Sequence, residues 1–397
     1  MSHNVEKSTR YLVVGGGRAA DAACRGILEV DPDPDAILLV GAESHPPYAR
    51  PPLSKALWKG DAEATVFRLT VDLGVYERLG RTIVALDLDG HTATDDRGER
   101  YSFEKLLLAT GGRPRRLPFA DEGVIYFRTL ADYHRLRRLV DEGVRVVVIG
   151  GGFIGSEIAA ALALNGCPAT MVFPEAGIGA RVFPPELSSS LLAYYRELGV
   201  DVLPGASVAA VEPGRVVLAD GRGLTAGAIV AGLGIEPNVE LASEAGLPVE
   251  DGIVVDSFGR AGGRPDVFAA GDVARFPVAA LGGELRRVEH DEHARTHGRR
   301  VGSNMAGADE PYDHLPYFYS DLFDLGYEAV GDLDARLTTV SELDDLHGQG
   351  AVYYLDGERR PRGVLLWNLY GRVEEARELI AAGEPFSAAV ALAELPR

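Results

Sequence analysis

Two glycine-rich fingerprints, each following a short apolar run and opening a helical stretch, constrain the fold of this chain most. In the clearer one, Gly150, Gly152 and Gly155 have the spacing G-x-G-x-x-G within the segment 144–175. The first glycine permits a tight turn, the second lets the backbone approach a pyrophosphate, and the third lets helix and strand pack closely. A pyrophosphate there meets the unpaired N–H groups of a helix N-terminus. The order strand, glycine turn, helix and strand predicts a Rossmann-like dinucleotide-binding unit.

Glu175 ends this segment, 25 positions after Gly150. A carboxylate at this place accepts from a ribose 2′-hydroxyl and repels a 2′-phosphate, which predicts NADH over NADPH. The alternative is an ordinary glycine-rich turn, but strand, helix and acid together disfavour it.

The second fingerprint lies at the start of the chain. Gly15, Gly17 and Ala20 follow an apolar run as G-x-G-x-x-A, and Glu43 stands just beyond the next apolar run. Two fingerprints in one chain predict two dinucleotides, and the natural pair is FAD and a nicotinamide nucleotide. A Rossmann-like repeat that binds nothing remains the alternative.

Two later segments are expected to complete the FAD site. The proline-rich segment 46–58 is predicted to be extended and to present Arg50 and Lys55, although a lysine is often only a solvated charge. The strand 101–108 runs into the sequence ATGGRPR at 109–115, a Gly/Pro turn that is expected to carry the chain from the flavin domain into the next domain, with Arg113 to Arg116 near a pyrophosphate.

The segment 267–274 is predicted to be a strand that delivers Gly271 and Asp272 to the start of a helix, where Asp272 accepts from ribityl hydroxyls or caps the helix. In the histidine-rich segment 286–294, Glu289, His290 and His293 do not have H-E-x-x-H spacing, so we predict no metal site there. We expect a turn that places a histidine near the flavin.

These segments predict an α/β fold with two Rossmann-like domains and a C-terminal α+β domain. The FAD-binding domain is expected at 1–118 and 248–310, the NADH-binding domain at 119–247, and the C-terminal interface domain at 311–397. The last contains five strand-like segments followed by predicted helices at 373–382 and 386–395. Its aromatic residues are expected mainly to pack a core, and covering the flavin or forming a homodimer interface are the alternatives.

The composition of the chain argues against some classes of binding partner and indicates a cellular compartment. The net charge of −19 argues against nucleic acid and anionic membranes as partners. No apolar run reaches transmembrane length, and the N-terminus has no signal-peptide core, so we expect no membrane span and a cytoplasmic enzyme. Cys24 and Cys167 are far apart and are each predicted within a helix after a glycine turn, which argues against a thiol–disulfide relay.

The distinctive segments are PYARPPLSK, ATGGRPR, IGGGFIGSE, GIEPNVEL, AAGD, RRVEHDEHA, FYSDLFDLGYEAVG and GVLLWN. Together they resemble the ferredoxin-reductase-like branch of the two-dinucleotide flavoproteins, and more closely the apoptosis-inducing-factor-like proteins. The resemblance runs from Tyr11 to about Ala382 and implies a glutathione-reductase-like fold of the pyridine nucleotide-disulfide oxidoreductase superfamily, without the redox disulfide.

The resemblance, together with the fingerprints, implies two sets of cofactor contacts and no metal. FAD is expected at Gly15, Gly17, Ala20, Glu43, Arg50, Lys55, Thr110, Gly111, Arg128, Gly271, Asp272, Glu289, His290 and Tyr319. NAD is expected at Gly150, Gly152, Phe153, Ile154, Gly155, Glu157, Glu175, Arg181, Gly234 and Glu328.

Three of these residues are implied to be catalytic. Lys55 would stand beside the reactive flavin nitrogen and stabilise the anionic reduced flavin. Glu157 would neutralise Lys55 in the resting state and meet the nicotinamide carboxamide, and His290 would lie where nicotinamide and isoalloxazine meet.

The chain also departs from the apoptosis-inducing-factor pattern. Tyr319 stands where the family usually has tryptophan, and Asp291 where the mammalian protein has a second histidine. The mitochondrial targeting segment and the long C-terminal insertion of the mammalian protein are missing, and the acidity opposes DNA binding. We therefore carry over the redox chemistry and leave out the cell-death role.

The sequence predicts an FAD-dependent NADH oxidoreductase that transfers a hydride from NADH to FAD and then electrons to an unidentified acceptor. In one version of this prediction, the reduced flavin and NAD form a long-lived charge-transfer complex. Quinone, oxygen and a ferredoxin-type protein are the candidate acceptors. The alternatives are the ferredoxin or rubredoxin reductase of an oxygenase system, which needs a local basic patch such as 113–116, and a redox sensor that dimerises in response to NADH.

Overall fold

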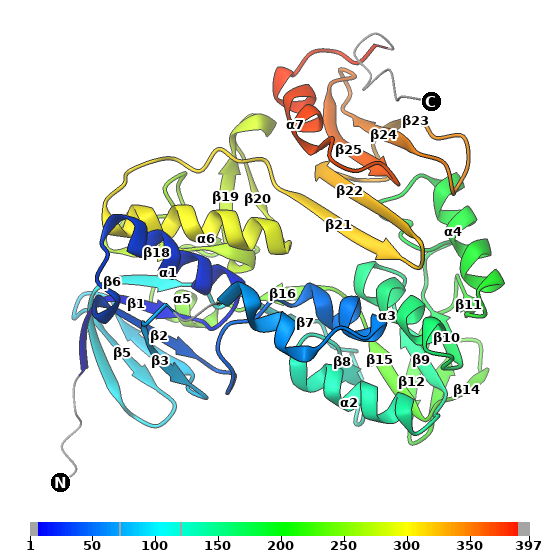
Figure 1. The fold of residues 1–397 in the computed structure, drawn as a ribbon, viewed down its shortest axis with the longest axis horizontal. Coiled ribbons are helices and arrows are strands. Elements are labelled where there is room, and N and C mark those ends of the chain that lie inside the picture. Colours follow the sequence, from blue (N-terminus) through cyan, green and yellow to red (C-terminus); the bar gives the residue numbers. More distant parts are fainter. Residues whose placement is uncertain (1–6, 71–72, 120, 388–397) are drawn as a thin grey trace. The chain divides into compact units, whose positions relative to one another are not determined.

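The structure is a computed structural model that describes residues 7–70, 73–119 and 121–387. By its internal contacts the chain divides into two compact units (Figure 1). Unit 1 contains Met1–Ala49, Glu63–Arg113 and Glu236–Pro316, and unit 2 contains Arg50–Ala62, Pro114–Ile235 and Tyr317–Arg397. Two short strands, β7 (Gly112–Pro114) and β16 (Ile235–Pro237), lie where the chain crosses from one unit to the other.

Unit 1 is built on a seven-stranded sheet of order β3-β2-β1-β6-β5-β4, with β18 also beside β6. Its strands are β1 (Lys7–Val14), β2 (Ile37–Gly41), β3 (Tyr76–Leu79), β4 (Ile83–Asp87), β5 (Thr92–Asp95), β6 (Arg100–Leu108) and β18 (Val267–Ala269). The five strands other than β4 and β5 pair in parallel, and β2 is buried at every position. Burial on both faces explains why β2 and the last residues of β1 and β6 read as continuous apolar runs.

Helices α1 (Arg18–Val30) and α6 (Asp291–Ala306) pack against each other in unit 1 (Figure 1). A Cβ atom on Gly26 or on Gly302 would lie 2.0 Å or 2.1 Å from a backbone oxygen of the facing helix. The helices approach so closely because glycines stand at the crossing. The position of α6 therefore depends on α1, the helix that follows the fingerprint at Gly15, Gly17 and Ala20.

The remaining elements of unit 1 are short. A three-stranded sheet contains β17 (Ile253–Val254), β19 (Ala274–Val278) and β20 (Glu284–Arg287). The helical turns are α5 (Glu240–Glu244), η1 (Pro34–Ala36), η4 (Glu63–Thr70), η5 (Gly271–Val273) and η6 (Ala279–Leu281).

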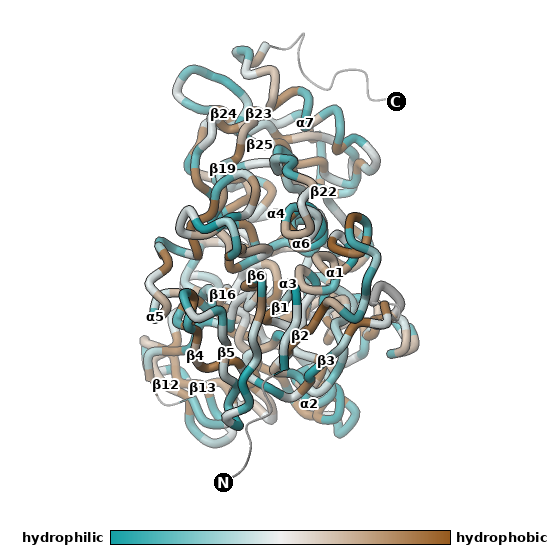
Figure 2. The backbone as a smooth tube through the Cα atoms, turned by 90° about the vertical axis from the view of Figure 1, so that its left-hand side faces the viewer, coloured by the Kyte–Doolittle hydropathy of each residue, from teal (hydrophilic) through white to brown (hydrophobic). Residues whose placement is uncertain are grey.

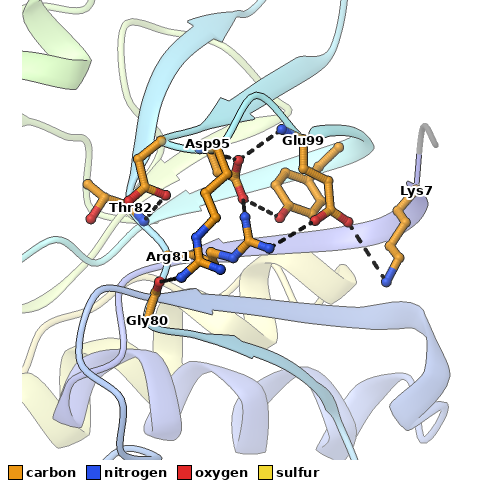
Figure 3. Close-up of polar contacts among 9 residues, drawn as sticks. Lys7, Gly80, Arg81, Thr82, Asp95 and Glu99 are labelled. Atoms are coloured by element: carbon orange, nitrogen blue, oxygen red, sulfur yellow. Dashed lines mark hydrogen bonds and ion pairs between the residues drawn. The ribbon is translucent and has the colours of Figure 1, made fainter. Parts of the chain in front are cut away.

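A polar cluster fixes the β4–β5–β6 part of the sheet (Figure 3). The fully buried Asp95 carboxylate accepts from Arg81 Nη1 at 2.8 Å and Tyr101 Oη at 2.9 Å, and from the N–H groups of Arg97 and Glu99 at 2.9 Å each. Burial raises the pKa of Asp95, but the Glu99 N–H and the other donors outweigh it, so this pKa lies below its usual value. The cluster stabilises the sheet rather than a ligand site.

Unit 2 contains a five-stranded parallel sheet of order β11-β10-β9-β15-β8. Its strands are β8 (Ile125–Tyr126), β9 (Val146–Ile149), β10 (Ala169–Val172), β11 (Asp201–Leu203) and β15 (Ala228–Ala231), and a small antiparallel sheet contains β12 (Val208–Glu212), β13 (Arg215–Leu218) and β14 (Gly223–Thr225). The helices are α2 (Leu130–Asp141), α3 (Phe153–Leu164) and α4 (Pro185–Glu197). The second Rossmann-like arrangement predicted from the fingerprint is thus present.

The C-terminal part of unit 2 is an antiparallel sheet of order β21-β22-β25-β24-β23 with helix α7 (Val373–Ala382) against it. The strands are β21 (Tyr317–Leu322), β22 (Leu325–Gly331), β23 (Thr338–Glu342), β24 (Gly350–Leu355) and β25 (Pro361–Trp367). All five predicted strands and the helix at 373–382 are confirmed. Figure 2 shows hydrophobic stretches alternating with hydrophilic loops along the chain. The predicted helix at 386–395 lies mostly outside the described residues.

Two predictions about local structure were wrong. The segment 46–58 is not extended throughout, because Pro51–Ser54 and Ala56–Lys59 form the 3-10 turns η2 and η3. Proline fixes φ near −65°, which suits the first turn of a helix as well as an extended segment. The helix expected after Gly271 is only the single turn η5, and the chain continues directly into β19.

The cysteine prediction was half right. Cys24 lies in α1, whereas Cys167 follows the end of α3 in a loop. Gly166, with φ of +69°, ends that helical stretch earlier than the apolar pattern predicts. Both cysteines, which the described residues include, are buried free thiols, and burial raises the pKa of each.

Candidate active site

In the fingerprint of unit 2, neighbouring atoms leave no space for a side chain at two of the glycines, but they leave space at the third. Gly150 has φ of +118°, and a Cβ there would lie 2.4 Å from the Gly232 oxygen. A Cβ on Gly155 would lie 2.0 Å from the Gly150 oxygen. Gly152, the N-cap of α3, has no atom within 4 Å of an added Cβ. Packing thus fixes the turn and leaves open space at the helix N-terminus, as a bound pyrophosphate requires.

Unit 1 repeats this arrangement. Gly15 has φ of +126°, and a Cβ there would lie 2.1 Å from the Ala109 oxygen. Gly17 is the N-cap of α1 and again has open space where a side chain would stand. Ala20 is fully buried in the core beneath the turn. Both fingerprints therefore have the shape that fits a dinucleotide pyrophosphate.

The two acids that follow the fingerprints have different partners. Glu43 Oε2 accepts from the Tyr48 hydroxyl at 2.6 Å. Glu175 Oε1 pairs with Arg181, at 2.9 Å from Nε and 2.6 Å from Nη2. The Arg181 side chain is 85% exposed, so this ion pair can open at little cost.

The most specific arrangement in unit 2 surrounds Glu157. Lys55 Nζ lies 2.6 Å from Glu157 Oε1, and the two side chains are only 11% and 5% exposed. The Ser54 hydroxyl donates to Glu157 Oε2 at 2.5 Å, and the Ser320 hydroxyl donates to Oε1 at 2.6 Å. Three donors on one carboxylate offset the cost of burying its charge.

Three separate elements bring these side chains together. Ser54 ends η2, and Lys55 stands between η2 and η3; Glu157 lies in the first half of α3, and Ser320 lies on β21. Contacts of α3 with η2, η3 and β21 hold these elements in place.

The loop that carries Lys55 is fixed through Trp58. The Trp58 indole donates to the Leu53 oxygen at 2.8 Å, its ring packs edge-on against Tyr133, and its carbonyl accepts from the Asn165 amide at 3.0 Å. The Lys55 ammonium is thereby presented from a well-packed loop.

A shallow pocket on the surface of unit 2 reaches the ion pair. It is lined by Ser54, Lys55, Trp58, Lys59, Glu157, Ala160, Ala161, Leu164, Asp321 and Phe323. Tyr319 lies on the same strand as Asp321, and its ring centroid is 5.5 Å from Lys55 Nζ, within range of a cation–π interaction.

The charge of Glu157 affects the pKa of two buried tyrosines. Burial raises the pKa of Tyr195 and of Tyr327 well above 10, and the Glu157 carboxylate raises both further. Both rings therefore stay neutral around an ionised carboxylate.

The other predicted residues of unit 2 lie in this framework. Arg50 Nη1 donates to the Arg128 oxygen at 2.9 Å. Glu328 faces Tyr319 across the β21–β22 ladder, and its Oε2 accepts from the Gly371 N–H at 3.0 Å.

Phe153 and Ile154 open α3. The Phe153 ring lies 5.0 Å from the Phe318 ring, and Ile154 is 37% exposed. Gly234 has φ of +81°, and its oxygen accepts from the Arg115 N–H at 2.9 Å.

In unit 1, the end of β6 is held by Asn238. The Thr110 hydroxyl donates to the Asn238 oxygen at 2.8 Å, and the Asn238 side-chain amide donates to the Thr110 oxygen at 2.8 Å. The Gly111 oxygen accepts from the Asn238 N–H at 3.0 Å. Asn238 therefore positions both predicted flavin contacts.

Arg287 organises the last group of predicted flavin contacts. Its guanidinium lies 2.7 Å from Glu289 Oε1 and donates to the Asp272 oxygen at 3.3 Å. His290 is the N-cap of α6. Burial lowers the pKa of His290 to about 4, against the smaller effects of the Asp272 and Glu292 charges, so the imidazole is neutral near pH 7.

Sequence reasoning missed four residues of these arrangements: Ser54, Asn238, Arg287 and Ser320. Ser54 could have been suspected because it adjoins Lys55. Ser320 is 163 positions from Glu157, and no motif joins the two.

Three comparisons agree with this geometry. The family model for pyridine nucleotide-disulphide oxidoreductases matches residues 9–298, and that for the C-terminal part of mitochondrion-associated apoptosis-inducing factor matches 301–343. A ferredoxin–NAD(+) reductase component of the anthranilate 1,2-dioxygenase system of Burkholderia cepacia is 37% identical over 388 residues, which cover 94% of each chain.

Two further relatives cover nearly all of the chain. Mitochondrial apoptosis-inducing factor 1 of Dictyostelium discoideum is 34% identical over 418 residues, which cover 94% of this chain and 78% of that protein. Putidaredoxin reductase in its covalent complex with putidaredoxin has a TM-score of 0.89 at 30% identity, covering 98% of this chain and 97% of that one.

Two dinucleotide fingerprints, one on a mostly parallel sheet and one on a parallel sheet, together with an antiparallel C-terminal sheet, define a two-dinucleotide flavoprotein. The chain belongs to the pyridine nucleotide-disulphide oxidoreductase family. It is an FAD-dependent NAD(P)H oxidoreductase, and the predicted fold class, family and cofactors are confirmed. Within the described ranges, the structure has no helix long and apolar enough to span a membrane.

Proposed function

We propose that this protein takes a hydride from NADH onto FAD and passes the electrons to a ferredoxin-type protein. The similarity to a dioxygenase-system ferredoxin reductase along 94% of both chains supports this acceptor most directly. The fold similarity to putidaredoxin reductase, whose crystal structure contains its protein partner, supports the same class.

Bound FAD supplies the redox chemistry, and the protein supplies binding, orientation and charge. In our proposal Lys55 places a buried positive charge that favours the reduced, anionic cofactor. Glu157 balances that charge before reduction and holds the ammonium at a fixed point. The single observation that carries this role is the 2.6 Å ion pair, whose two side chains line a pocket and are nearly buried.

The cofactor contacts expected from the sequence become part of this proposal, as do its three domains. Gly17 and Gly152 would face the two pyrophosphates, where each has open space. Glu175 would bind the NADH ribose and disfavour NADPH by charge repulsion. A cytoplasmic location also stays a prediction.

We do not expect the basic segment 113–116 to serve as the docking face for an acidic ferredoxin, because two of its three arginines, Arg113 and Arg116, are paired with acids. Arg113 pairs with Glu236 at 2.7 Å and with Glu240 at 2.6 Å. Arg116 pairs with Asp121 at 3.1 Å. These acids offset the positive charge on which docking of an acidic partner depends, so we expect docking to use other cations.

The test is anaerobic mixing of the NADH-reduced protein with an oxidised [2Fe–2S] ferredoxin from an oxygenase system. We expect the ferredoxin to be reduced at a rate that saturates with its concentration and falls at high salt. Bleaching of the flavin by NADH with no electron transfer to any ferredoxin, but with turnover on quinones, would reject the proposed acceptor.

A second candidate has support from the C-terminal match at 301–343. In this version the reduced protein keeps NAD in a long-lived charge-transfer complex and reacts slowly with oxygen or quinones, and a long-wavelength band that persists in air would favour it over the reductase. The redox sensor that dimerises in response to NADH is a separate alternative. Size-exclusion chromatography with and without NADH tests it, and a shift to dimer with NADH would favour the sensor.

A further inference from the structure

We propose that Ser320 is a positioning residue for the Lys55–Glu157 pair, through which the C-terminal sheet fixes the place of the Lys55 ammonium. This inference rests on the proposed role of Lys55. It starts from an asymmetry among the three donors to Glu157. Ser54 and Lys55 are neighbours in one loop, whereas Ser320 belongs to β21 and is 163 positions away from Glu157.

The direction of the Ser320 hydrogen bond follows from chemistry. An ionised carboxylate only accepts, so the Ser320 hydroxyl must donate its proton to Glu157 Oε1. Lys55 Nζ donates to the same oxygen. Ser320 is 2% exposed, so water does not readily replace its hydroxyl.

The strand that carries Ser320 is itself well fixed. Ser320 pairs with Tyr327 in the β21–β22 ladder. Tyr327 is buried, stacks on Trp367 with ring centroids 5.8 Å apart, and packs edge-on against Phe183. Large buried aromatic side chains thus hold the ladder in which the serine lies.

Removal of the Ser320 hydroxyl has a specific consequence. Of the three donors to Glu157, only the two from the loop at 54–55 would remain, and no donor from the C-terminal sheet would hold the carboxylate. The carboxylate and the ammonium could then shift together, because the terminal torsion of a glutamate is broad. Of the three donors to Glu157, Ser320 is therefore the one that connects the ion pair to the C-terminal sheet of unit 2.

The first test measures how readily the Lys55 amine is chemically modified, and it does not depend on enzyme activity. Acetic anhydride labelling at one pH, followed by mass spectrometry, gives the ratio of Lys55 to Lys59 modification in the FAD-loaded protein. Lys59 lies on η3 beside the same pocket and serves as the internal control. We expect Ser320→Ala to raise this labelling ratio about threefold or more, because Glu157, which holds the Lys55 amine, is then less constrained.

Matched variants separate positioning from general damage. Ser341→Ala makes the same change at an exposed site on β23 of the same sheet and should leave the ratio unchanged. Ser320→Thr keeps the hydroxyl and should return the ratio toward the wild-type value. It also keeps the proposal testable if the alanine variant folds poorly.

The second test is a double-mutant cycle on flavin reduction by NADH. Ser320→Ala should slow reduction about tenfold with little change in the KM for NADH, since it acts on Lys55 rather than on substrate binding. In a Glu157→Gln background, the same change should add less than about twofold, because Ser320 acts through that carboxylate.

Two results would overturn the inference: an unchanged labelling ratio in Ser320→Ala, or fully additive rate effects in the cycle. Failure of the proposed function is distinguishable from both. If NADH does not reduce the wild-type flavin, the proposed function fails, while the labelling ratio still reports on Ser320.

Discussion

Lys55 Nζ lies 2.6 Å from Glu157 Oε1, although 102 positions separate the two residues. Each side chain is nearly buried, so each charge would be costly without the other. The pair joins the loop at the boundary of η2 and η3 to helix α3, which begins at the nicotinamide fingerprint. The proposed cation is thereby fixed to the helix whose N-terminus is expected to bind NADH.

Substitution of Lys55 tests the role of the cation. We expect Lys55→Ala to retain FAD but to slow flavin reduction by NADH at least about tenfold and to lower the flavin midpoint potential, because the reduced anion loses its counter-charge. Anaerobic stopped-flow absorbance and potentiometry measure the two effects. The control Lys59→Ala, in the same loop, should change neither. Unchanged reduction rates in Lys55→Ala would remove this residue from the mechanism.

Loss of Lys55 should also affect stability. It leaves a buried carboxylate with only the two serine donors, Ser54 and Ser320, and breaking a buried pair costs roughly 3 kcal/mol. We expect the double variant Lys55→Met/Glu157→Leu to unfold at a higher denaturant concentration than Lys55→Met alone. Equal midpoints for the two variants would show that the unpaired Glu157 carboxylate carries no such cost.

Gly152 has space for a side chain and Gly155 has none, so alanine at the two positions should affect cofactor binding and folding stability, respectively. Gly152→Ala has space for its methyl group and should fold normally, but should raise the KM for NADH about tenfold because the methyl occupies the pyrophosphate position. Gly155→Ala places a Cβ 2.0 Å from the Gly150 oxygen and should lose folding stability instead. Steady-state kinetics and thermal unfolding separate the two. A normal KM in Gly152→Ala would place the pyrophosphate elsewhere.

Glu175 is predicted to set the preference for NADH. Glu175→Gln removes the repulsion of a 2′-phosphate, so the ratio of kcat/KM for NADH over NADPH should fall about tenfold. The matched control is Glu197→Gln, an exposed glutamate of α4, which should leave the ratio unchanged. An unchanged ratio in Glu175→Gln would assign cofactor choice to another residue.

Three histidines, the N-cap residue His290 and the α6 residues His293 and His297, predict an acid-sensitive unit 1, and burial lowers the pKa of His293 well below 6.5. Burial lowers the pKa of His290 to about 4 and that of His297 to about 3, below the ordinary value of 6.5. Between pH 6.5 and 4 the unfolded chain therefore binds more protons than the folded one. The free energy of unfolding should fall as the pH falls, by up to about 1.4 kcal/mol per pH unit for each histidine.

Urea unfolding at pH 7, 6 and 5 measures this dependence. His297 Nδ1 accepts from the Gly271 N–H at 3.3 Å, and a glutamine side chain can offer an oxygen in its place. We expect His297→Gln to reduce the slope against pH by the share of one histidine. A slope that is identical in the variant and the wild type would show that His297 is not the titrating group.

The elements were largely predictable because local patterns specify them. Glycine spacing located both dinucleotide turns, and alternating or continuous apolar runs located the five C-terminal strands. The segment 46–58 was mispredicted because proline is compatible with both extended and 3-10 backbone. The loop position of Cys167 was missed because the apolar pattern continues past the end of α3.

The site was predictable only where the family resemblance reached. Lys55 and Glu157 were expected to pair, and the structure has them 2.6 Å apart. The donors Ser54 and Ser320 were missed because a serine hydroxyl leaves no periodic signal, and Ser320 reaches Glu157 only through the packing of β21 on α3. Asn238 was missed because its partner Thr110 is far along the chain, and Arg287 because its contact with Asp272 is to a backbone oxygen, which no sequence pattern marks.

The most direct measurement is anaerobic stopped-flow mixing of the purified, FAD-containing protein with NADH while the flavin absorption band is recorded. We predict rapid bleaching of the band with one equivalent of NADH, and much slower bleaching with NADPH. A protein that contains no FAD, or whose flavin band does not change on mixing with NADH, would contradict the proposed function.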